Sequence, residues 1–187
     1  MTAYHRFLGP LATIAAVTLT ACADGTPVGP ARALAPRGAQ ATLATVADFN
    51  TAIAELRRAT AKYHDVSAAL ADGFVPVVAG CEEREGEARV AIPYASIARI
   101  LDGVLDPSLP DALLYEPAKD GKHKLVGVEM VIPYPLWTAA QPPRFLGVPL
   151  QREDELGVFG LHVWVWRHNP NGMFAVDNPN VSCDLAS

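Results

Sequence analysis

Two side chains that can exchange protons or bind a metal ion stand in the middle of apolar runs. Glu129 lies within residues 126–131, and His162 lies between Leu161 and Val163. A buried carboxylate needs a partner, because an ionised group loses its hydration when it leaves water. If the two runs are neighbouring strands, Glu129 could orient the His162 imidazole, or both side chains could ligate one metal ion.

A third candidate ligand is His64, which stands in the sequence Tyr63-His64-Asp65. Two histidines with a carboxylate would form a metal triad, but the chain has no His-x-His or His-Glu-x-x-His motif. A packing histidine on a helix surface is the other interpretation of His64. The sequence therefore predicts no cofactor, and it leaves open a small metal-dependent or acid–base enzyme that uses His162, Glu129 and His64.

Motifs of other enzyme classes are absent from the sequence. It contains no Gly-x-Ser-x-Gly elbow, no phosphate-binding loop and no dinucleotide glycine fingerprint. The acidic residues near position 154 belong to the charge run Gln151-Arg152-Glu153-Asp154-Glu155, a pattern typical of a solvated loop. These observations favour a role other than catalysis without excluding catalysis.

The most informative pattern is the alternation in residues 158–168, which predicts a strand. One side would carry Leu161, Val163 and Val165, and the other side would carry His162, Trp164, Trp166 and His168. His162 and His168 would lie about 20 Å apart at ~3.3 Å per residue, too far to share a metal ion. The aromatic side could be a stacking platform for a flat or sugar-like ligand, with Trp164, Trp166 and His168 as binding residues. Alternatively, the two tryptophans cover the second face of the sheet beneath a loop.

The elements that would position these residues can be predicted from periodicity and turn residues. Apolar and small positions recur every three or four residues in 48–71, which predicts one long amphipathic helix stopped by Gly73. Strands at 112–116 and 124–132 flank a turn that contains Asp-Gly, which predicts a hairpin. In its second strand, Val126, Val128, Met130 and Ile132 would share one face, and Leu125, Gly127, Glu129 and Val131 the other. We therefore expect an α+β domain in which one long N-terminal helix packs on a small antiparallel sheet with long loops.

The N-terminal 46 residues have the composition of an export and anchoring segment. Residues 1–21 combine a basic start, a short apolar core and small residues, which predicts a signal peptide. Leu19-Thr20-Ala21-Cys22 is similar to a lipobox, so Cys22 would be lipidated, for example with palmitate, and would anchor the protein. The alternative is an ordinary signal peptide with an incidental cysteine. Residues 22–46 are rich in Ala, Gly, Pro and Thr and predict a disordered tether before a single domain at 47–187.

Cysteine number and net charge narrow the environment of that domain. Beyond Cys22 the chain has only Cys81 and Cys183, and an even pair in an exported protein predicts one disulfide. A metal-binding thiol pair is the alternative, but the Cys-x-x-Cys spacing is absent. The formal net charge of −5 and the lack of a basic patch argue against nucleic acid as a partner.

Several blocks of the sequence together are similar to a known family. They are Tyr63-His64-Asp65, Leu161-His162-Val163-Trp164, His168-Asn169-Pro170-Asn171-Gly172-Met173-Phe174 and Asn178-Pro179-Asn180-Val181-Ser182-Cys183. The chain resembles an uncharacterised family of secreted bacterial proteins, and the likeness covers nearly the whole domain. That family carries a Gly-Met-Gly-x-His-Tyr motif after its first cysteine, and Pro93 stands here where its histidine would fall. The resemblance supports the fold and the disulfide, and it puts an enzymatic role for this chain in doubt.

Taken together, the sequence predicts an exported lipoprotein held at the outer membrane or cell surface by its lipid anchor. Its domain would be a ligand-binding module that uses the face lined by Trp and His side chains. The two alternatives are the small enzyme described above and a structural lipoprotein whose partner is another protein.

The lipid anchor can be tested by Cys22→Ser. Because the thiol of Cys22 would carry the first acyl group, the variant should lose all labelling by a fatty-acid analogue and leave the membrane fraction. Labelling of the variant as strong as that of the parent chain would contradict the lipoprotein assignment.

Overall fold

The computed structural model describes residues 46–77, 81 and 91–183. All described residues belong to one compact unit of the chain. The predicted signal peptide, Cys22 and residues 22–45 of the tether lie outside the described residues, as does the segment 82–90. Within the described ranges, no helix is both long enough and apolar enough to cross a lipid bilayer.

The predicted long helix is present, but it ends at His64 rather than at residue 71. It comprises α1 (Val46–Thr60) and the 3₁₀ turn η1 (Ala61–His64), and α2 (Val66–Ala71) follows as a separate helix. Asp65 causes the break, because its extended backbone leaves the helix and its side chain accepts the Ser67 N–H at 2.9 Å, capping α2. The restart turns the helix, so that Ala69 is buried and Leu70 is exposed.

Gly73 ends α2 as predicted, since its φ of +84° is the left-handed conformation that glycine adopts without strain. The Phe74 N–H bonds to the Ala69 carbonyl at 3.0 Å and the Gly73 N–H bonds to the Leu70 carbonyl at 3.1 Å. This pair of bonds is a Schellman motif, and the buried side chains of Phe74 and Ala69 accompany it.

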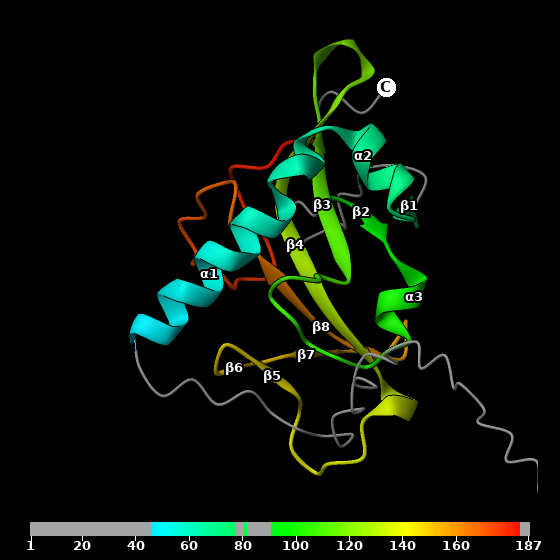
Figure 1. Cartoon of the computed structure of the whole chain (residues 1–187), viewed down its shortest axis with the longest axis vertical. Helices are drawn as coiled ribbons and strands as arrows, with labels where there is room; N and C mark the ends of the chain where they lie inside the picture. Colours follow the sequence, from blue (N-terminus) through cyan, green and yellow to red (C-terminus); the bar gives the residue numbers. More distant parts are fainter. Residues whose placement is uncertain (1–45, 78–80, 82–90, 184–187) are drawn as a thin grey trace, which may run out of the picture. The chain divides into compact units, whose positions relative to one another are not determined.

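The described residues form a six-stranded antiparallel sheet in the order β1-β2-β3-β4-β8-β7. The strands are β1 (Val75–Pro76), β2 (Ile92–Ala95), β3 (Ala112–Pro117), β4 (His123–Pro133), β7 (Gln151–Glu153) and β8 (Val158–Val163). A separate two-stranded ribbon joins β5 (Arg144–Phe145) to β6 (Val148–Pro149), and the short helices are α3 (Ile97–Ile100), η2 (Lys119–Gly121) and η3 (Tyr134–Leu136). In Figure 1, α1 crosses the sheet, and its buried residues belong to the same apolar cluster as residues of β3, β4 and β8. The predicted α+β fold is confirmed.

The predicted hairpin is formed by β3 and β4, with η2 between them and Gly121 at a φ of +65°. Its face assignment is wrong at one end, because the register shifts between Leu114 and Tyr115. The shift leaves Val126 as an extra residue, a β-bulge that exchanges the faces of the residues before it. Leu125 consequently joins the core beside α1, and Val126 joins a second apolar cluster on the opposite face.

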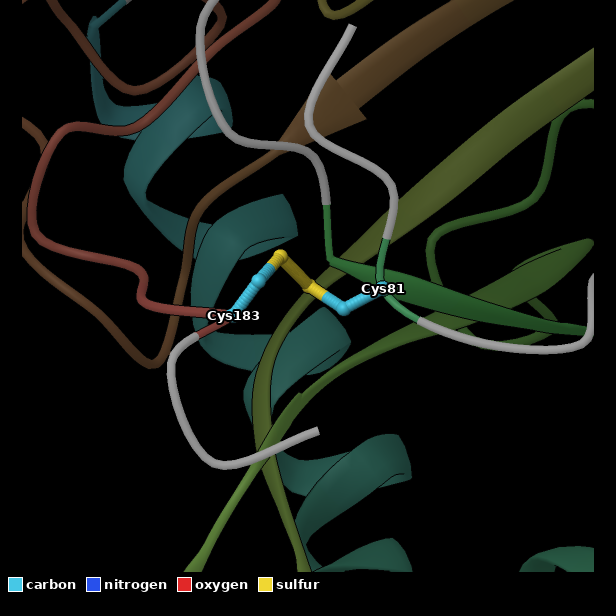
Figure 2. The surroundings of a disulfide bond; sticks show 2 residues. All are labelled: Cys81 and Cys183. Carbon is cyan, nitrogen blue, oxygen red and sulfur yellow. A yellow bond between two sulfur atoms is a disulfide. The ribbon is translucent and has the colours of Figure 1, made fainter. Parts of the chain in front are cut away.

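The predicted disulfide is present between Cys81 and Cys183, whose Cα atoms are 5.4 Å apart. Figure 2 shows it joining the chain ahead of β2 to the end of the C-terminal segment. The two cysteines are 102 residues apart in the sequence. For a loop of about 100 residues, the chain-entropy estimate of stabilisation is about 4.7 kcal/mol.

The segment leading to Cys183 is held by two Asn-Pro-Asn turns that repeat the same hydrogen bonds. Asn169 and Asn178 each accept, through Oδ1, the N–H of the asparagine two residues later at 3.0 Å. Their amide groups donate across to the other turn, Asn169 to the Asp177 carbonyl and Asn178 to the Arg167 carbonyl. The two Asn-Pro-Asn motifs of the sequence thus have a structural role.

Asp111 is a buried carboxyl group directly before the first residue of β3. It is 1% exposed, its Oδ2 accepts the Val131 N–H at 2.8 Å, and its Oδ1 has no hydrogen-bond partner among the described residues. Burial raises the pKa of Asp111 well above its usual range, and the nearby carboxylates Asp102 and Glu129 raise it further. The Val131 hydrogen bond and, more weakly, Arg99 oppose this shift of the Asp111 pKa.

We predict that Asp111 makes the domain less stable as pH rises. A carboxyl group whose pKa is raised in the folded state binds its proton more tightly there, so stability falls between the ordinary and the raised pKa. Asp111→Asn keeps an acceptor for Val131 but cannot ionise, so its stability should lose this pH dependence. Asp111→Ala should cost about 1–3 kcal/mol, because it leaves the Val131 N–H unpaired. Urea unfolding across a pH series measures both effects, and a difference between Asp111→Asn and the parent that is constant with pH would refute the assignment.

Candidate functional site

Glu129 and His162 are direct register partners on β4 and β8, so the two strands are neighbours as the sequence hypothesis required. The His162 Nε2 lies 3.9 Å from Glu129 Oε1, and the two side chains are 15% and 18% exposed. The distance is too long for a hydrogen bond. The two facing atoms, His162 Nε2 and Glu129 Oε1, are therefore not hydrogen-bonded to each other.

A small pocket opens beside this pair at the edge of the sheet. Its volume is about 10 Å³, which is room for one water-sized group. It is lined by side chains from β4, β7, β8 and the C-terminal segment, namely Glu129, Gln151, Glu153, Gly160, Leu161, His162, Phe174 and Val176. The pocket thus combines two carboxylates and an imidazole with an apolar wall.

Gly160 forms part of the pocket because it has no side chain. A Cβ built at this position would lie 2.9 Å from Glu129 Oε1 and 3.6 Å from Glu153 Cγ. Gly160 pairs with Val131 of β4 on one side and with Gln151 of β7 on the other. The two carboxylates therefore approach Gly160 from its two neighbouring strands.

The ring of His162 is oriented by the C-terminal segment. Its Nδ1 lies 2.5 Å from the Val176 carbonyl oxygen, which can only accept, so Nδ1 carries a hydrogen and donates. In the neutral imidazole, Nε2 is then the acceptor nitrogen, and it faces Glu129. Phe174 packs edge-on against Phe49 of α1, with ring centroids 6.1 Å apart, which ties this segment to the helix.

The electrostatics of the pocket weaken the acidity of Glu129. Burial is the main cause that raises the pKa of Glu129, the negative charge of Glu153 raises it further, and His162 lowers it. Within the described part of the chain, no donor hydrogen-bonds to the Glu129 carboxylate. Glu129 is thus a carboxylate with unmet accepting capacity beside a pocket.

The predicted aromatic platform is not formed, because the strand ends at Val163 rather than at residue 168. The Val165 N–H bonds to the Val163 carbonyl at 2.9 Å, which places a γ-turn at Trp164. The Trp166 N–H then returns to β4 and bonds to the Val126 carbonyl at 3.1 Å. The turn interrupts the alternation, and Trp164 and Trp166 consequently pack in different clusters.

Trp164 remains on the same face as His162, with the ring centroids 5.5 Å apart, but it is only 3% exposed. Its indole N–H donates to the Ala175 carbonyl at 2.7 Å, and the C-terminal segment covers it. β4 approaches it closely because Gly127 has no side chain, as a Cβ there would lie 3.3 Å from Trp164 Cε3. The alternative interpretation of the sequence, a tryptophan beneath a loop, describes Trp164.

The remaining predicted site residues lie apart from the pocket. Trp166 donates to Thr60 Oγ1 at 3.1 Å and packs edge-on against His64 of η1, with ring centroids 4.5 Å apart. His168 is exposed in the turn after Trp166. Pro93 lies on β2 and pairs with Leu114.

The hypothesis of a metal triad gains no support from this arrangement. His64 is not among the residues that line the pocket beside Glu129 and His162. In the described ranges, no group of three or more His, Cys, Asp or Glu side chains is placed to hold a metal ion.

Sequence reasoning missed Glu153, Gln151 and Gly160. Residues 151–155 were interpreted as a solvated loop, whereas Gln151–Glu153 form the edge strand β7, whose Glu153 lines the pocket. Three residues are too few for alternation to be recognised in a charged run. A glycine inside a strong strand pattern was the available signal, since it often marks a close approach of other groups.

No family model, curated protein or solved structure matches this chain.

We predict a structural role for Trp164. Trp164→Ala should lower the free energy of unfolding by about 3–5 kcal/mol, because it empties a buried site and leaves the Ala175 carbonyl without its donor. Urea unfolding measures this loss, and Trp137→Ala is the matched control, since that indole is partly exposed and donates to the Gln141 carbonyl at the surface. A loss below about 1 kcal/mol for Trp164→Ala would contradict the buried role.

Proposed function

We propose that this chain is a lipid-anchored cell-envelope protein whose domain binds a ligand in the pocket beside Glu129 and His162. The lipobox at Cys22 and the Pro- and Gly-rich residues that follow it support the anchor. The disulfide between Cys81 and Cys183 supports an oxidising compartment outside the cytosol.

The observation that carries the binding role is the Glu129 carboxylate at the pocket, which accepts no hydrogen bond from the described residues. A largely buried carboxylate without a hydrogen-bond donor is costly, and natural proteins keep such groups where a ligand, ion or water completes them. The pocket lies on the same sheet face as Trp164, so the ligand-binding face inferred from the sequence is retained. In this proposal the binding residues are Glu129, His162 and Glu153 rather than the tryptophans. Trp164 is covered by the C-terminal segment, and Trp166 packs against the main core.

An acid–base enzyme that uses Glu129 and His162 is the second candidate. It is favoured by the raised pKa of Glu129, since burial near a second carboxylate is one way in which catalytic acids are tuned. Against it, the Val176 carbonyl engages His162 Nδ1, which leaves Nε2 as the one ring nitrogen that could act on a substrate. The pocket also admits only one small group of a substrate.

The binding role can be tested by titrating the full chain with a panel of small amines, carboxylates, phosphates, polyols and amides. The readout is the NMR spectrum of the histidine rings, with His162→Ala used to assign the His162 signals. At least one class should shift those signals saturably. Glu129→Gln should weaken binding about tenfold, which corresponds to ~1.4 kcal/mol for a charged hydrogen bond.

Three other results would change the proposal. If no class perturbs His162, the pocket is not the binding site. Conversion of a probe that Glu129→Gln abolishes would favour the acid–base enzyme. About one metal ion per purified chain, lost on His162→Ala, would favour the metal-dependent enzyme.

A further inference from the structure

The polar groups that line the pocket are mostly hydrogen-bond acceptors. Glu129 on β4 and Glu153 on β7 contribute carboxylates, and they flank Gly160 on the strand between them. Ionised carboxylates can only accept hydrogen bonds. A ligand group that enters between them must therefore supply donors.

His162 adds a further acceptor when its ring is neutral. The Val176 carbonyl occupies the Nδ1 hydrogen, so the Nε2 lone pair points to the side on which Glu129 lies. Gln151 can donate as well as accept, but it is exposed at the rim. Donors thus come from the ligand rather than from the walls.

We propose that the pocket receives a primary ammonium group of the ligand, with Glu129, Glu153 and His162 Nε2 as its acceptors. The inference rests on the proposed binding function and names the chemical class of the ligand. An ammonium group carries three donors and one positive charge, which matches converging acceptors and two carboxylates. Its size is close to that of a water molecule, which is the space that the pocket provides.

Other ligand groups fit this pocket less well. A phosphate or carboxylate would face two negative charges without a lysine or arginine among the lining residues. A guanidinium group is planar and larger than one water-sized site. The apolar wall of Phe174 and Val176 suits the alkyl chain that carries an amine.

Binding of an ammonium group would require Glu129 in its ionised form. Because the pKa of Glu129 is raised, affinity should fall on acidification at a higher pH than an ordinary glutamate would give. The charged or titratable groups that shift the pKa of Glu129 are His162 on β8 and Glu153 on β7. Asp111, directly before β3, is a third nearby group, because the charge of Glu129 raises the pKa of Asp111.

The probes that test the ligand class are butylammonium, butyrate and butanol, which each contain four carbon atoms in a linear chain. Each is titrated into the full chain while the His162 ring signals are followed by NMR. Butylammonium should bind saturably and at least about tenfold more tightly than butyrate or butanol. Equal or tighter binding of butyrate or butanol overturns the ammonium assignment.

Two variants separate charge from space in this experiment. Glu129→Gln removes a charge and keeps the shape, and Gly160→Ala keeps the charges and fills the pocket, where the flexible Glu129 carboxylate can give way. Each should weaken butylammonium binding about tenfold or more. Glu155→Gln is the matched control, because it removes an equal charge from an exposed residue outside the pocket and should leave binding within about twofold.

The outcomes also separate this inference from the binding function itself. Butyrate binding that Gly160→Ala abolishes would keep the pocket as a binding site and overturn the ammonium group as its ligand. Butylammonium binding that is unchanged in both Glu129→Gln and Gly160→Ala would overturn the assignment to this pocket. A binding curve that loses affinity equally in Glu155→Gln would show long-range charge attraction alone and would also overturn it.

Discussion

The antiparallel pairing of β4 with β8 is the contact on which the rest of this domain depends. It joins the hairpin in the middle of the sequence to the C-terminal strand, and its register sets Glu129 opposite His162 and Met130 opposite Leu161. A slip of one residue would exchange the two faces of β8, placing His162 toward the core and Leu161 toward the pocket. The apolar residues Met130, Ile132, Leu161 and Val163 beside α1 stabilise this register, so the core and the pocket are two consequences of one alignment.

Two local irregularities adapt this pairing at the same place. The bulge on β4 leaves Val126 as an extra residue, and the γ-turn at Trp164 directly follows the partner strand β8. The Trp166 N–H bonds to the Val126 carbonyl beyond the turn, and Val126 and Trp164 share the second apolar cluster. A bulge on one strand opposite a turn in the other segment keeps backbone hydrogen bonds available while both segments bend. The consequence for function is that Trp164 becomes part of the core of the second face, and the polar pocket is confined to the part of that face near Gly160.

The C-terminal segment completes both the fold and the site. The two Asn-Pro-Asn turns hold each other through side-chain amides, and the disulfide attaches the end of the segment to the chain before β2. Between the two turns, the segment supplies the carbonyls of Ala175 and Val176, which bind Trp164 and His162. The asparagine side chains of this segment form hydrogen bonds with backbone N–H and carbonyl groups, which a loop that covers a sheet needs for its own polar groups. The orientation of the His162 ring follows from that loop.

The sequence by itself determined the features that depend on local pattern or on counting. A helix predicted from residue 48, the stop at Gly73, the hairpin with its Asp-Gly turn and the disulfide between two remaining cysteines all follow from periodicity, turn chemistry and cysteine number. Both Glu129 and His162 stand inside strong strand patterns, so the sequence predicts that they lie close together if the two strands are neighbours. Only the tertiary structure decided where those patterns stop. The alternating pattern of the sequence predicts regular strands through Val126 and beyond Val163. A bulge or a γ-turn interrupts them there, and such irregularities depend on the partner strand and on close approaches such as that of Gly127 to Trp164. The role of Glu153 was likewise decided in three dimensions, because a three-residue edge strand carries too little pattern of its own and acquires its position from β8.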